Sequence, residues 1–319
     1  MPVFINNNVQ SAIDNNGYYH VKAPLLNCDE INHLTDLYYN SALAQKTDYA
    51  LYNAIQSDNK DELRQITTTL TGLMETKLCE ICSNFFIVYG GFLEKQPNKN
   101  VMVYHHQDGT FIDKEKPNTR SYTCWIPLTD IDLYNGCLGV INKSHTIYKD
   151  INPLPYPHVH RPLLKHAYSL LPYTTFVEMK RGEMLIFDTN TFHTSLPNIS
   201  NEPRLALSFW ITGSAEDLAF YYLKPATKDT LLKYRIDRSF FQKYENENLL
   251  DLYNSNKVID DYELMDEVPF LYKDYSILKM IREVKDRGNR YNAGTVKVLK
   301  DKFDMDVSPF HLLKQILFG

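Results

Sequence analysis

The sequence of 319 residues predicts a mainly β fold with flanking helices. Two observations support this prediction. Short apolar runs rich in Val, Ile, Phe and Tyr recur between residues 85 and 212, which is typical of strands. Apolar residues three and four positions apart, typical of helices, occur in the segments before and after that region. We therefore expect a core at 1–212 that includes N-terminal helices, followed by a helical extension at 213–319.

The N-terminal segment should contain two helices, the first of which packs on the outside of a sheet. Residues 1–26 are expected to form an entry strand or loop. Asn27 then precedes a helical pattern, and Glu30 follows three positions later, which is the arrangement of a capping box. A second helix is expected to begin at residue 57 or 58, because acidic residues in its first turn are followed by apolar residues at helical spacing.

The run Val101–Asp108 is expected to end a strand on a pair of metal ligands. His106 and Asp108 are two residues apart, so on a strand both side chains point to the same face. A third ligand has to come from another strand, and His193 follows the short apolar run Met184–Phe187. Two histidines and one carboxylate would hold a metal and leave one face of it open.

The run Arg204–Trp210 predicts an alternating strand whose even positions share one face. Arg204 would then point into the interior of the fold beside the small side chains of Ala206 and Ser208. Because an unpaired buried charge is strongly unfavourable, this guanidinium requires an anion. The simplest candidate is the carboxylate of a bound acid.

Two further strands are expected at Ser121–Leu128 and Cys137–Ile141. The dipeptide Asn135-Gly136 between them predicts a tight turn, because both residue types tolerate positive φ.

The proline-rich segment 146–178 predicts a loop that could lie over the mouth of the core. His158 and His160 in this loop form a rival metal pair. They have no carboxylate partner nearby and no guaranteed common face, so we expect them to be solvated loop histidines.

After Thr212 the pattern predicts helices that pack on the core and could wall off a substrate site. They are expected at Thr230–Tyr244, at Tyr275–Asp286 with Gly288 closing it, and from Ser308-Pro309 onward. No chemical motif appears there. A separate binding domain is the weaker alternative, because no flexible linker precedes the region.

Composition restricts the class of protein. The net charge is −5 and no cluster of Lys and Arg alternates with aromatic residues, so nucleic acid is not an expected partner. Five cysteines do not form a disulfide framework, and Cys79 and Cys82 are expected to be buried structural residues. Neither a signal peptide nor an apolar run of membrane-spanning length is apparent, which predicts a cytoplasmic enzyme without a membrane span.

Several spaced motifs occur in a fixed order along about residues 80 to 212. They are His106-x-Asp108, Trp125–Gly136, Val140–His145, Gly182–Asp188 and His193-x10-Arg204. In this order the sequence resembles the phytanoyl-CoA dioxygenase family, whose members are Fe(II)- and 2-oxoglutarate-dependent oxygenases.

The resemblance implies a double-stranded β-helix core, of the jelly-roll or cupin-like kind, and a set of site residues. It implies that iron is held by His106, Asp108 and His193, that Arg204 pairs with the distal carboxylate of 2-oxoglutarate, and that O2 is the oxidant. Ser195 and Thr123 lie where family members hydrogen-bond the cosubstrate. One departure is His105, since the residue before the first ligand is commonly Trp. His145 matches a family motif that we interpret as structural.

The remaining predictions concern the substrate. Tyr104, Trp125 and Asn135 are candidates to line its pocket, and Asp188 either orients a ligand or forms a turn. We expect hydroxylation of an unactivated C–H bond in a small organic, amino-acid-like or lipid-like molecule, free or carrier-bound, in natural-product biosynthesis. Asp108 disfavours halogenation, because halogenating relatives have Ala or Gly there.

Other outcomes remain open from the sequence. Desaturation, epoxidation and cyclisation use the same iron ligands. A non-catalytic cupin-like protein would keep the metal without turnover. A metal-dependent hydrolase or isomerase could use the His-x-Asp pair and a water molecule, but it leaves Arg204 unexplained.

Overall fold

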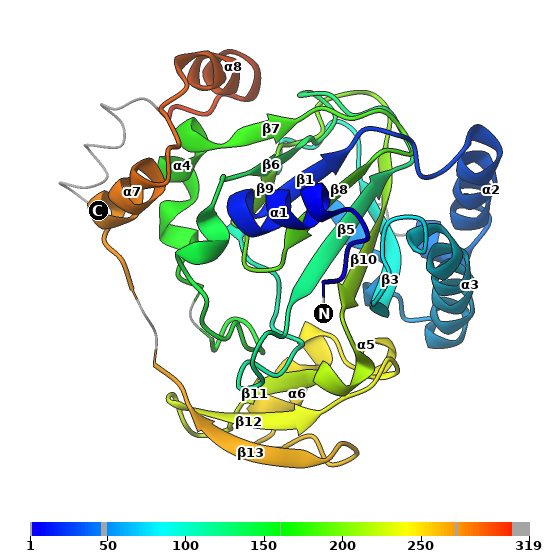
Figure 1. Ribbon diagram of the computed structural model, residues 1–319, viewed down its shortest axis with the longest axis vertical. Helices are drawn as coiled ribbons and strands as arrows, with labels where there is room; N and C mark the ends of the chain where they lie inside the picture. The colour runs from blue at the N-terminus through cyan, green and yellow to red at the C-terminus, as the bar shows by residue number, and fades with distance from the viewer. Residues whose placement is uncertain (1, 46–49, 160, 272–273, 308–319) are drawn as a thin grey trace.

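Two antiparallel sheets form the core of the computed structural model, which describes residues 2–45, 50–159, 161–271 and 274–307 (Figure 1). The larger sheet has the strand order β1-β8-β5-β10-β3-β2, and the smaller has the order β4-β9-β6-β7. The strands of the larger sheet are β1 (Tyr18–Val21), β8 (Met184–Asp188), β5 (Ser121–Pro127), β10 (Arg204–Thr212), β3 (Phe86–Lys95) and β2 (Leu51–Asn53). Those of the smaller sheet are β4 (Val103–His106), β9 (His193–Ser195), β6 (Leu138–Val140) and β7 (Thr175–Val177).

The two sheets face each other across one apolar interior. Trp125 and Leu185 of the larger sheet share a buried cluster with Leu138 and Val140 of the smaller sheet. This arrangement is a double-stranded β-helix, as the family resemblance implied.

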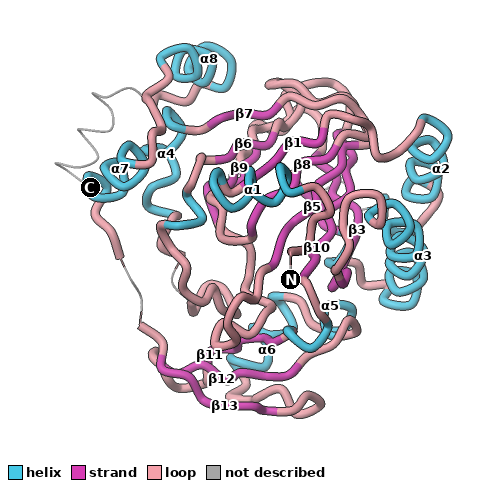
Figure 2. The backbone as a smooth tube through the Cα atoms, in the orientation of Figure 1, coloured by secondary structure: helices cyan, strands magenta, loops and turns pink. Residues whose placement is uncertain are grey.

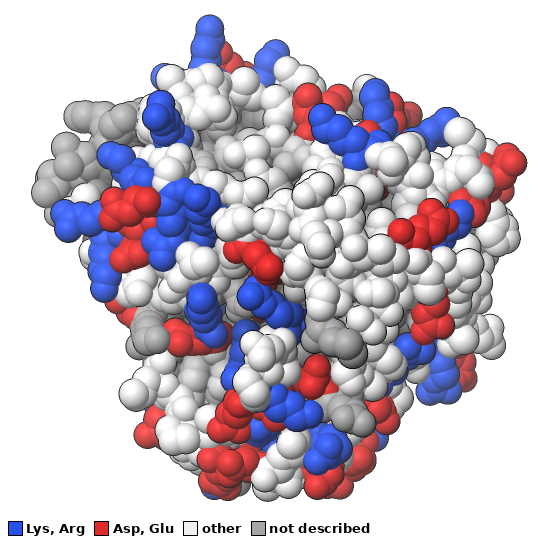
Figure 3. Space-filling model, in the orientation of Figure 1, with Lys and Arg blue, Asp and Glu red and all other residues white. Residues whose placement is uncertain are grey.

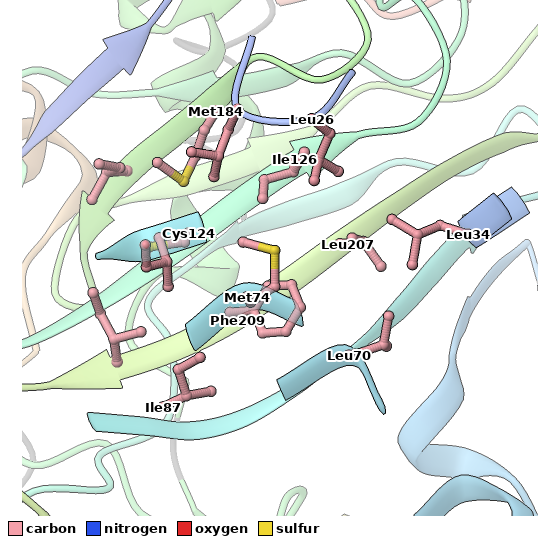
Figure 4. Packing of buried hydrophobic residues seen from close by; sticks show 14 of the residues in the cluster. Leu26, Leu34, Leu70, Met74, Ile87, Cys124, Ile126, Met184, Leu207 and Phe209 are labelled. Carbon is pink, nitrogen blue, oxygen red and sulfur yellow. The ribbon is translucent and has the colours of Figure 1, made fainter. Parts of the chain in front are cut away.

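The alternation predicted for β10 is confirmed. Leu207 and Phe209 belong to the cluster on the helical side of the sheet, whereas Ala206 belongs to the cluster between the sheets. Figure 4 shows Leu70 and Met74 of helix α3 beside Leu207 and Phe209. Strand β10 is paired on both sides, with β3 and with β5, so it lies in the middle of the larger sheet.

The N-terminal helices cover the outer face of the larger sheet, with α2 (Cys28–Tyr39) and α3 (Lys60–Leu78) side by side (Figure 1). The capping box predicted at Asn27 and Glu30 is present: each side chain accepts a hydrogen bond from the other residue's backbone N–H. The segment 1–26 differs from the prediction, because it contains helix α1 (Asn7–Asn16) before β1. Asn6 caps this helix, and its buried residues are Val9 and Ile13. Two apolar positions are too few to give a clear helical period in the sequence.

The C-terminal region is not helical throughout, contrary to the prediction. A three-stranded antiparallel sheet, β11-β12-β13, lies at the lower end of the molecule in Figure 1. The predicted helix Thr230–Tyr244 is wrong: residues 230–235 form β12, and only Phe240–Lys243 is helical. The apolar run in β12 is compatible with either structure, and its pairing with strands on both sides decides for the sheet. The strands are β11 (Ala219–Leu223), β12 (Thr230–Arg235) and β13 (Leu264–Pro269), and the nearby helices are α5 (Phe240–Lys243) and α6 (Asn246–Asn254).

Two helices follow this sheet, α7 (Ile277–Asp286) and α8 (Ala293–Phe303). Helix α7 confirms the prediction for that segment, since Ser276 caps its first turn and Gly288 beyond its end has a φ of 88°. The helix predicted from Ser308 lies outside the described residues. The division of the chain at residue 212 stays a prediction.

The segment between β6 and β7 is mostly loop, as Figure 2 shows, and includes the short helix α4 (Ala167–Leu170). Short 3-10 helices occur at Ala42–Gln45, Ala54–Gln56, Ser144–Thr146, Leu164–His166, Leu171–Tyr173 and Ala215–Asp217. Among the described residues, no helix is both long and apolar enough to span a membrane. Basic and acidic side chains are interspersed on the face shown in Figure 3, with a group of Lys and Arg near α7.

Candidate metal centre

The three predicted ligands come together at the edge where β4 and β9 pair. His106 at the end of β4 lies directly opposite His193 at the start of β9, and their ring centroids are 4.1 Å apart. Asp108 follows two residues later and places its Oδ1 atom 3.7 Å from Nε2 of His193. One ligand atom from each of the three residues lies within 4.8 Å of the others, which is compatible with a single ion between them.

Both imidazoles present the same ring nitrogen to this centre. Nδ1 of His106 lies 2.9 Å from the carbonyl oxygen of Tyr104, and Nδ1 of His193 lies 3.0 Å from that of Thr191. A carbonyl oxygen can only accept a hydrogen bond, so each Nδ1 carries the proton. The lone pair of each ring is therefore on Nε2, the atom left to bind a metal.

Burial also keeps the two rings neutral. It lowers the pKa of His193 to about 4. Burial lowers the pKa of His106 to about 3, with a contribution from His193 and a smaller one from Arg161. The neutral imidazole is the metal-binding form, so both ligands are ready to bind at pH 7.

Asp108 is held in place through both its carboxylate and its backbone. Its Oδ2 atom accepts a 2.5 Å hydrogen bond from the hydroxyl of Thr123. Its backbone N–H donates to the carbonyl oxygen of Thr189, and its own carbonyl oxygen accepts from Asn152. Oδ1, the atom nearer to His193, is free of these contacts and can face a metal ion.

Arg204 lies at the start of β10 with its side chain completely enclosed, at 2% exposure. Among the residues that the structure describes, its Nε and Nη1 atoms have no hydrogen-bond partner. The guanidinium instead lies over the ring of Trp125, with 5.2 Å between Cζ and the ring centroid. Burial lowers the pKa of Arg204 to about 10. These unpaired donors mark the place for an anion.

A second buried cation, Lys95, lies beside Arg204. The two residues face each other across the pairing of β3 and β10. Nζ of Lys95 donates to the hydroxyl and the carbonyl oxygen of Ser195, at 3.0 and 3.2 Å, and to the carbonyl oxygen of Leu196. Burial lowers the pKa of Lys95 well below its usual value, and the charge of Arg204 lowers it further.

Two strands connect the metal centre to these cations. On β9, His193 and Ser195 are two residues apart, and Ser195 contacts Lys95. On β5, Thr123 contacts Asp108, and Trp125, two residues further on, contacts Arg204. Two residues extend roughly 6.6 Å along a strand. A short dicarboxylic acid could therefore reach from the metal to Arg204.

A cavity of about 240 Å³ opens beside His106, the one candidate ligand in its wall. Its wall includes His106 and Tyr104 from β4 together with Tyr156 and Arg161 from the proline-rich segment. That this segment lies over the mouth of the core stays a prediction, and several of its residues line this cavity. His106 and Asp108 are partly exposed while His193 is buried, which leaves the centre accessible from this side.

The three residues predicted to line the substrate pocket lie in different parts of the structure. Tyr104 lines the cavity, and Trp125 lies under Arg204. Asn135 lies in the predicted turn, where its side chain hydrogen-bonds Asp130 and Asp132 and Gly136 has a φ of 94°. Its proposed contact with substrate receives no support from this position.

Four further residues take structural positions, outside the group of three candidate ligands. His105 is buried and its ring contacts the hydroxyl of Thr174, and it contributes to the same cavity wall as His106. His145 contacts a backbone carbonyl in α1, and His158 contacts Asn254. Asp188 caps the turn that follows β8, through the backbone and side-chain nitrogens of Asn190. His160 lies outside the described residues.

The cysteine prediction is half correct. All five cysteines are free, and Cys82 is buried as expected, but Cys79 is exposed at the end of α3. They are not part of the metal-binding group.

Sequence reasoning missed two charged residues of the site, Lys95 and Arg161. Lysine at the end of a strand usually reaches solvent, and no local pattern distinguishes Lys95 from such a residue. Arg161 lies in the segment predicted to be a loop over the mouth of the core, where the predictions concerned the two histidines. The Pro-rich sequence around it gave no signal that the side chain turns inward.

Comparisons with known proteins agree on one family. A family model described as Phytanoyl-CoA dioxygenase (PhyH) matches residues 13–206. The chain is 28% identical over 131 residues to "Phytanoyl-CoA dioxygenase 1" of Oryza sativa subsp. japonica, covering 39% of this chain and 44% of that protein. It is 28% identical over 143 residues to "Phytanoyl-CoA dioxygenase domain-containing protein 1" of Bos taurus, covering 40% and 45%. The aligned part thus spans somewhat less than half the length of these curated relatives.

Among solved structures, the chain is similar to a non-heme alpha ketoglutarate dependent carbocyclase, SnoK, from nogalamycin biosynthesis. The TM-score is 0.49 at 17% identity, covering 68% of this chain and 86% of the other. It is also similar to EvdO2 from Micromonospora carbonacea var. aurantiaca complexed with 2-oxoglutarate, with a TM-score of 0.44 at 15% identity, covering 67% and 94%.

Proposed function

Because this chain belongs to the phytanoyl-CoA dioxygenase family, we propose that it is an Fe(II)- and 2-oxoglutarate-dependent oxygenase that hydroxylates an unactivated C–H bond of a small organic molecule. The observation that carries the proposal is the convergence of His106, Asp108 and His193 on one point. Two imidazole nitrogens and one carboxylate oxygen are the donor set typical of non-heme Fe(II) oxygenases.

The donor atoms fit a divalent ion. Both histidines are neutral and present Nε2, and Asp108 directs Oδ1 toward the same point. Thr123 occupies the other carboxylate oxygen, so it fixes which oxygen would bind the metal. The side toward the cavity is left open for other ligands.

The surroundings of Arg204 fit a dicarboxylic cosubstrate. Its unpaired Nε and Nη1 atoms would donate to one end of 2-oxoglutarate, and the nearby charge of Lys95 would favour the same anion. The other end would reach the metal centre along β5 and β9. Ser195 already hydrogen-bonds Lys95 and the carbonyl oxygen of Gly136, so it would orient Lys95 as well as contact the cosubstrate.

Iron and 2-oxoglutarate bound at these residues would supply the oxidation of a C–H bond by O2, with release of succinate and CO2. The protein contributes position and exclusion of water. Tyr156 and Arg161 line the cavity beside His106 and would limit the entry of water once substrate is bound, and Tyr104 would contact the substrate from β4. Desaturation, epoxidation and ring closure need the same residues, and product analysis distinguishes them from hydroxylation.

The test is anaerobic titration of the protein with Fe(II) and then 2-oxoglutarate, followed by visible absorption. We expect a band that requires both additions, and conversion of 2-oxoglutarate to succinate once O2 is admitted. Asp108→Ala should lose the band and the hydroxylation. Asp61→Ala is the matched control, because it removes an exposed carboxylate from α3.

Two results would decide against the proposal. Iron binding without any effect of 2-oxoglutarate would favour a metal-binding protein without turnover. Full activity of Asp108→Ala would refute the assignment of the ligands.

A further inference from the structure

Arg161 brings a positive charge into the cavity beside the metal centre. The cavity wall contains no Asp or Glu within the part of the chain that the structure describes, and Arg161 is its single Lys or Arg there. The same wall contains His106, so the guanidinium and the metal ligand share one space. The remaining surface includes the apolar side chains of Pro162, Leu163 and Leu164.

The guanidinium of Arg161 has no anionic partner among the described residues. It lies over the ring of Tyr156, with 5.3 Å between Cζ of Arg161 and the ring centroid. Arg161 is half-buried, and burial lowers the pKa of its guanidinium. A guanidinium nevertheless stays protonated in proteins. A charge held this way is stabilised by an anion that enters the cavity.

The side-chain amides in the cavity wall use their donors elsewhere. Nε2 of Gln107 donates to the carbonyl oxygens of Tyr148 and Asn190, at 2.8 and 2.6 Å. Nδ2 of Asn152 donates to those of Gln107 and Asp108, at 3.0 and 2.9 Å. Arg161 is therefore the main source of free N–H donors for a molecule in this cavity.

We propose that Arg161 binds an anionic group of the substrate, a carboxylate or a phosphate, while the apolar part of the same molecule lies against Pro162–Leu164. This inference rests on the proposed function, which makes the cavity beside His106 the substrate site. It narrows the substrate class to a small amphiphilic acid. Arg204 serves a different anion, because it belongs to the interior between the sheets and is not part of the cavity wall.

Binding of matched probes tests the charge preference. The probes are 4-phenylbutyrate, 3-phenylpropyl phosphate and the neutral 4-phenylbutyramide, titrated calorimetrically into anaerobic protein that holds Fe(II) and 2-oxoglutarate. We expect at least one anionic probe to bind about tenfold or more tightly than the amide, since a charge-assisted bidentate contact contributes that much. The anionic probe that binds more tightly shows whether the site prefers a carboxylate or a phosphate. If neither binds more tightly than the amide, the proposal is overturned.

Two variants test whether the preference for anionic probes depends on Arg161. Arg161→Gln should bind the anionic probe and the amide equally. Lys165→Gln is the matched control: it removes a positive charge four residues away that pairs with Asp274 outside the cavity wall, and it should keep the preference of the wild type. A preference that survives in Arg161→Gln, or that disappears in Lys165→Gln, would overturn the assignment.

Thermal unfolding separates a binding role from a structural one. Because Arg161 has no polar partner to lose among the described residues, Arg161→Gln should unfold at the same temperature as the wild type or higher. The anionic probe should raise the unfolding temperature of the wild type alone. A clear fall in the variant's Tm without ligand would indicate a structural arginine and contradict the proposal.

The same samples distinguish this inference from the proposed function. The visible band that requires Fe(II) and 2-oxoglutarate is recorded on the wild type before any probe is added. If the band is absent, the proposed function fails. If the band forms and the anionic probes show no preference, the assignment of Arg161 fails alone.

Discussion

The hydroxyl of Thr123 donates a 2.5 Å hydrogen bond to Oδ2 of Asp108, and this contact connects the larger sheet to the candidate metal centre. Thr123 lies on β5, which is paired on both sides, whereas Asp108 lies just beyond the end of β4. The sequence predicted that Thr123 would contact the cosubstrate. That contact stays a prediction, and the structure adds a contact with a ligand.

Thr123→Val is expected to weaken metal binding about 10- to 100-fold, because valine has the shape of threonine without the hydroxyl that orients Asp108. Fe(II) or Co(II) titration under anaerobic conditions measures the affinity. Thr123→Ser restores the hydroxyl and should bind nearly as the wild type does. Equal affinities for the wild type and the valine variant would show that the hydrogen bond has no orienting role.

Arg204→Met is expected to raise the 2-oxoglutarate concentration needed for half-saturation about 10- to 100-fold, through loss of charge-assisted hydrogen bonds. Its free energy of unfolding without ligand should not fall, since an unpaired buried charge has been removed. Titration of the visible band and chemical denaturation provide the two values. Arg235→Met, which removes an exposed arginine paired with Glu263, is the control. An unchanged 2-oxoglutarate requirement would count against the cosubstrate site.

Lys95→Met should raise the 2-oxoglutarate requirement about tenfold and leave metal affinity near that of the wild type. The reason is that Lys95 contacts Ser195 and Leu196 on the cosubstrate side and makes no contact with the three ligands. Separate titrations with the metal and with 2-oxoglutarate test both parts. A large loss of metal affinity would mean that Lys95 acts by holding β9 in place instead.

The C-terminal sheet is joined to the core by a buried ion pair between Lys233 of β12 and Asp113, 2.7 Å apart. Burial alone would raise the pKa of Asp113, but the hydrogen bonds from Lys233 and from the backbone of Glu115, together with the charge of Lys233, outweigh it and the pKa is lowered. The pKa of Lys233 is raised, because its hydrogen bonds to Asp113 and Glu115 outweigh burial. Asp113→Asn should therefore reduce the free energy of unfolding by about 1–3 kcal/mol at pH 7.

The pH dependence of this loss in stability follows from the directions in which the two pKa values are shifted. The lowered pKa of Asp113 gives stability that is present above its ordinary value of 3.8 and is lost as the pH falls through the folded value. The raised pKa of Lys233 gives stability that is present below 10.5 and is lost as the pH rises through its folded value. Denaturation at several pH values should show the deficit of Asp113→Asn at neutral pH and its disappearance in acid. Asp266→Asn, an exposed carboxylate on β13, should show none, and a deficit independent of pH would contradict the ion-pair explanation.

Local patterns predicted much of the core and of the metal site. The spacing of His106 and Asp108, the alternation along β10 and the capping box at Asn27 each depend on residues close together in the chain. A rule of strand or helix geometry is enough to interpret such patterns. The short apolar run before His193 made it the candidate for the third ligand, and the family resemblance supported that choice.

The features that were missed depend on contacts between distant segments. Lys95 is buried because it reaches Ser195, 100 residues away, and neither residue's neighbours indicate this. The strand β12 was predicted to be a helix because consecutive apolar residues fit both structures, and its partners β11 and β13 decide between them. Helix α1 has too few buried residues to produce a detectable period.

Strand β10 is flanked by β3 and β5 and carries Arg204 at its first residue, whereas the cavity wall beyond His106 is built largely from a loop. Loops tolerate sequence change far better than a central strand does. The part of the site proposed to bind 2-oxoglutarate therefore lies on a central strand, whereas the part proposed to contact the substrate lies on a segment that is freer to change in sequence. If the proposed function holds, changes among residues 152–164 would alter which molecules the cavity accepts while leaving Arg204 and the three candidate ligands in place.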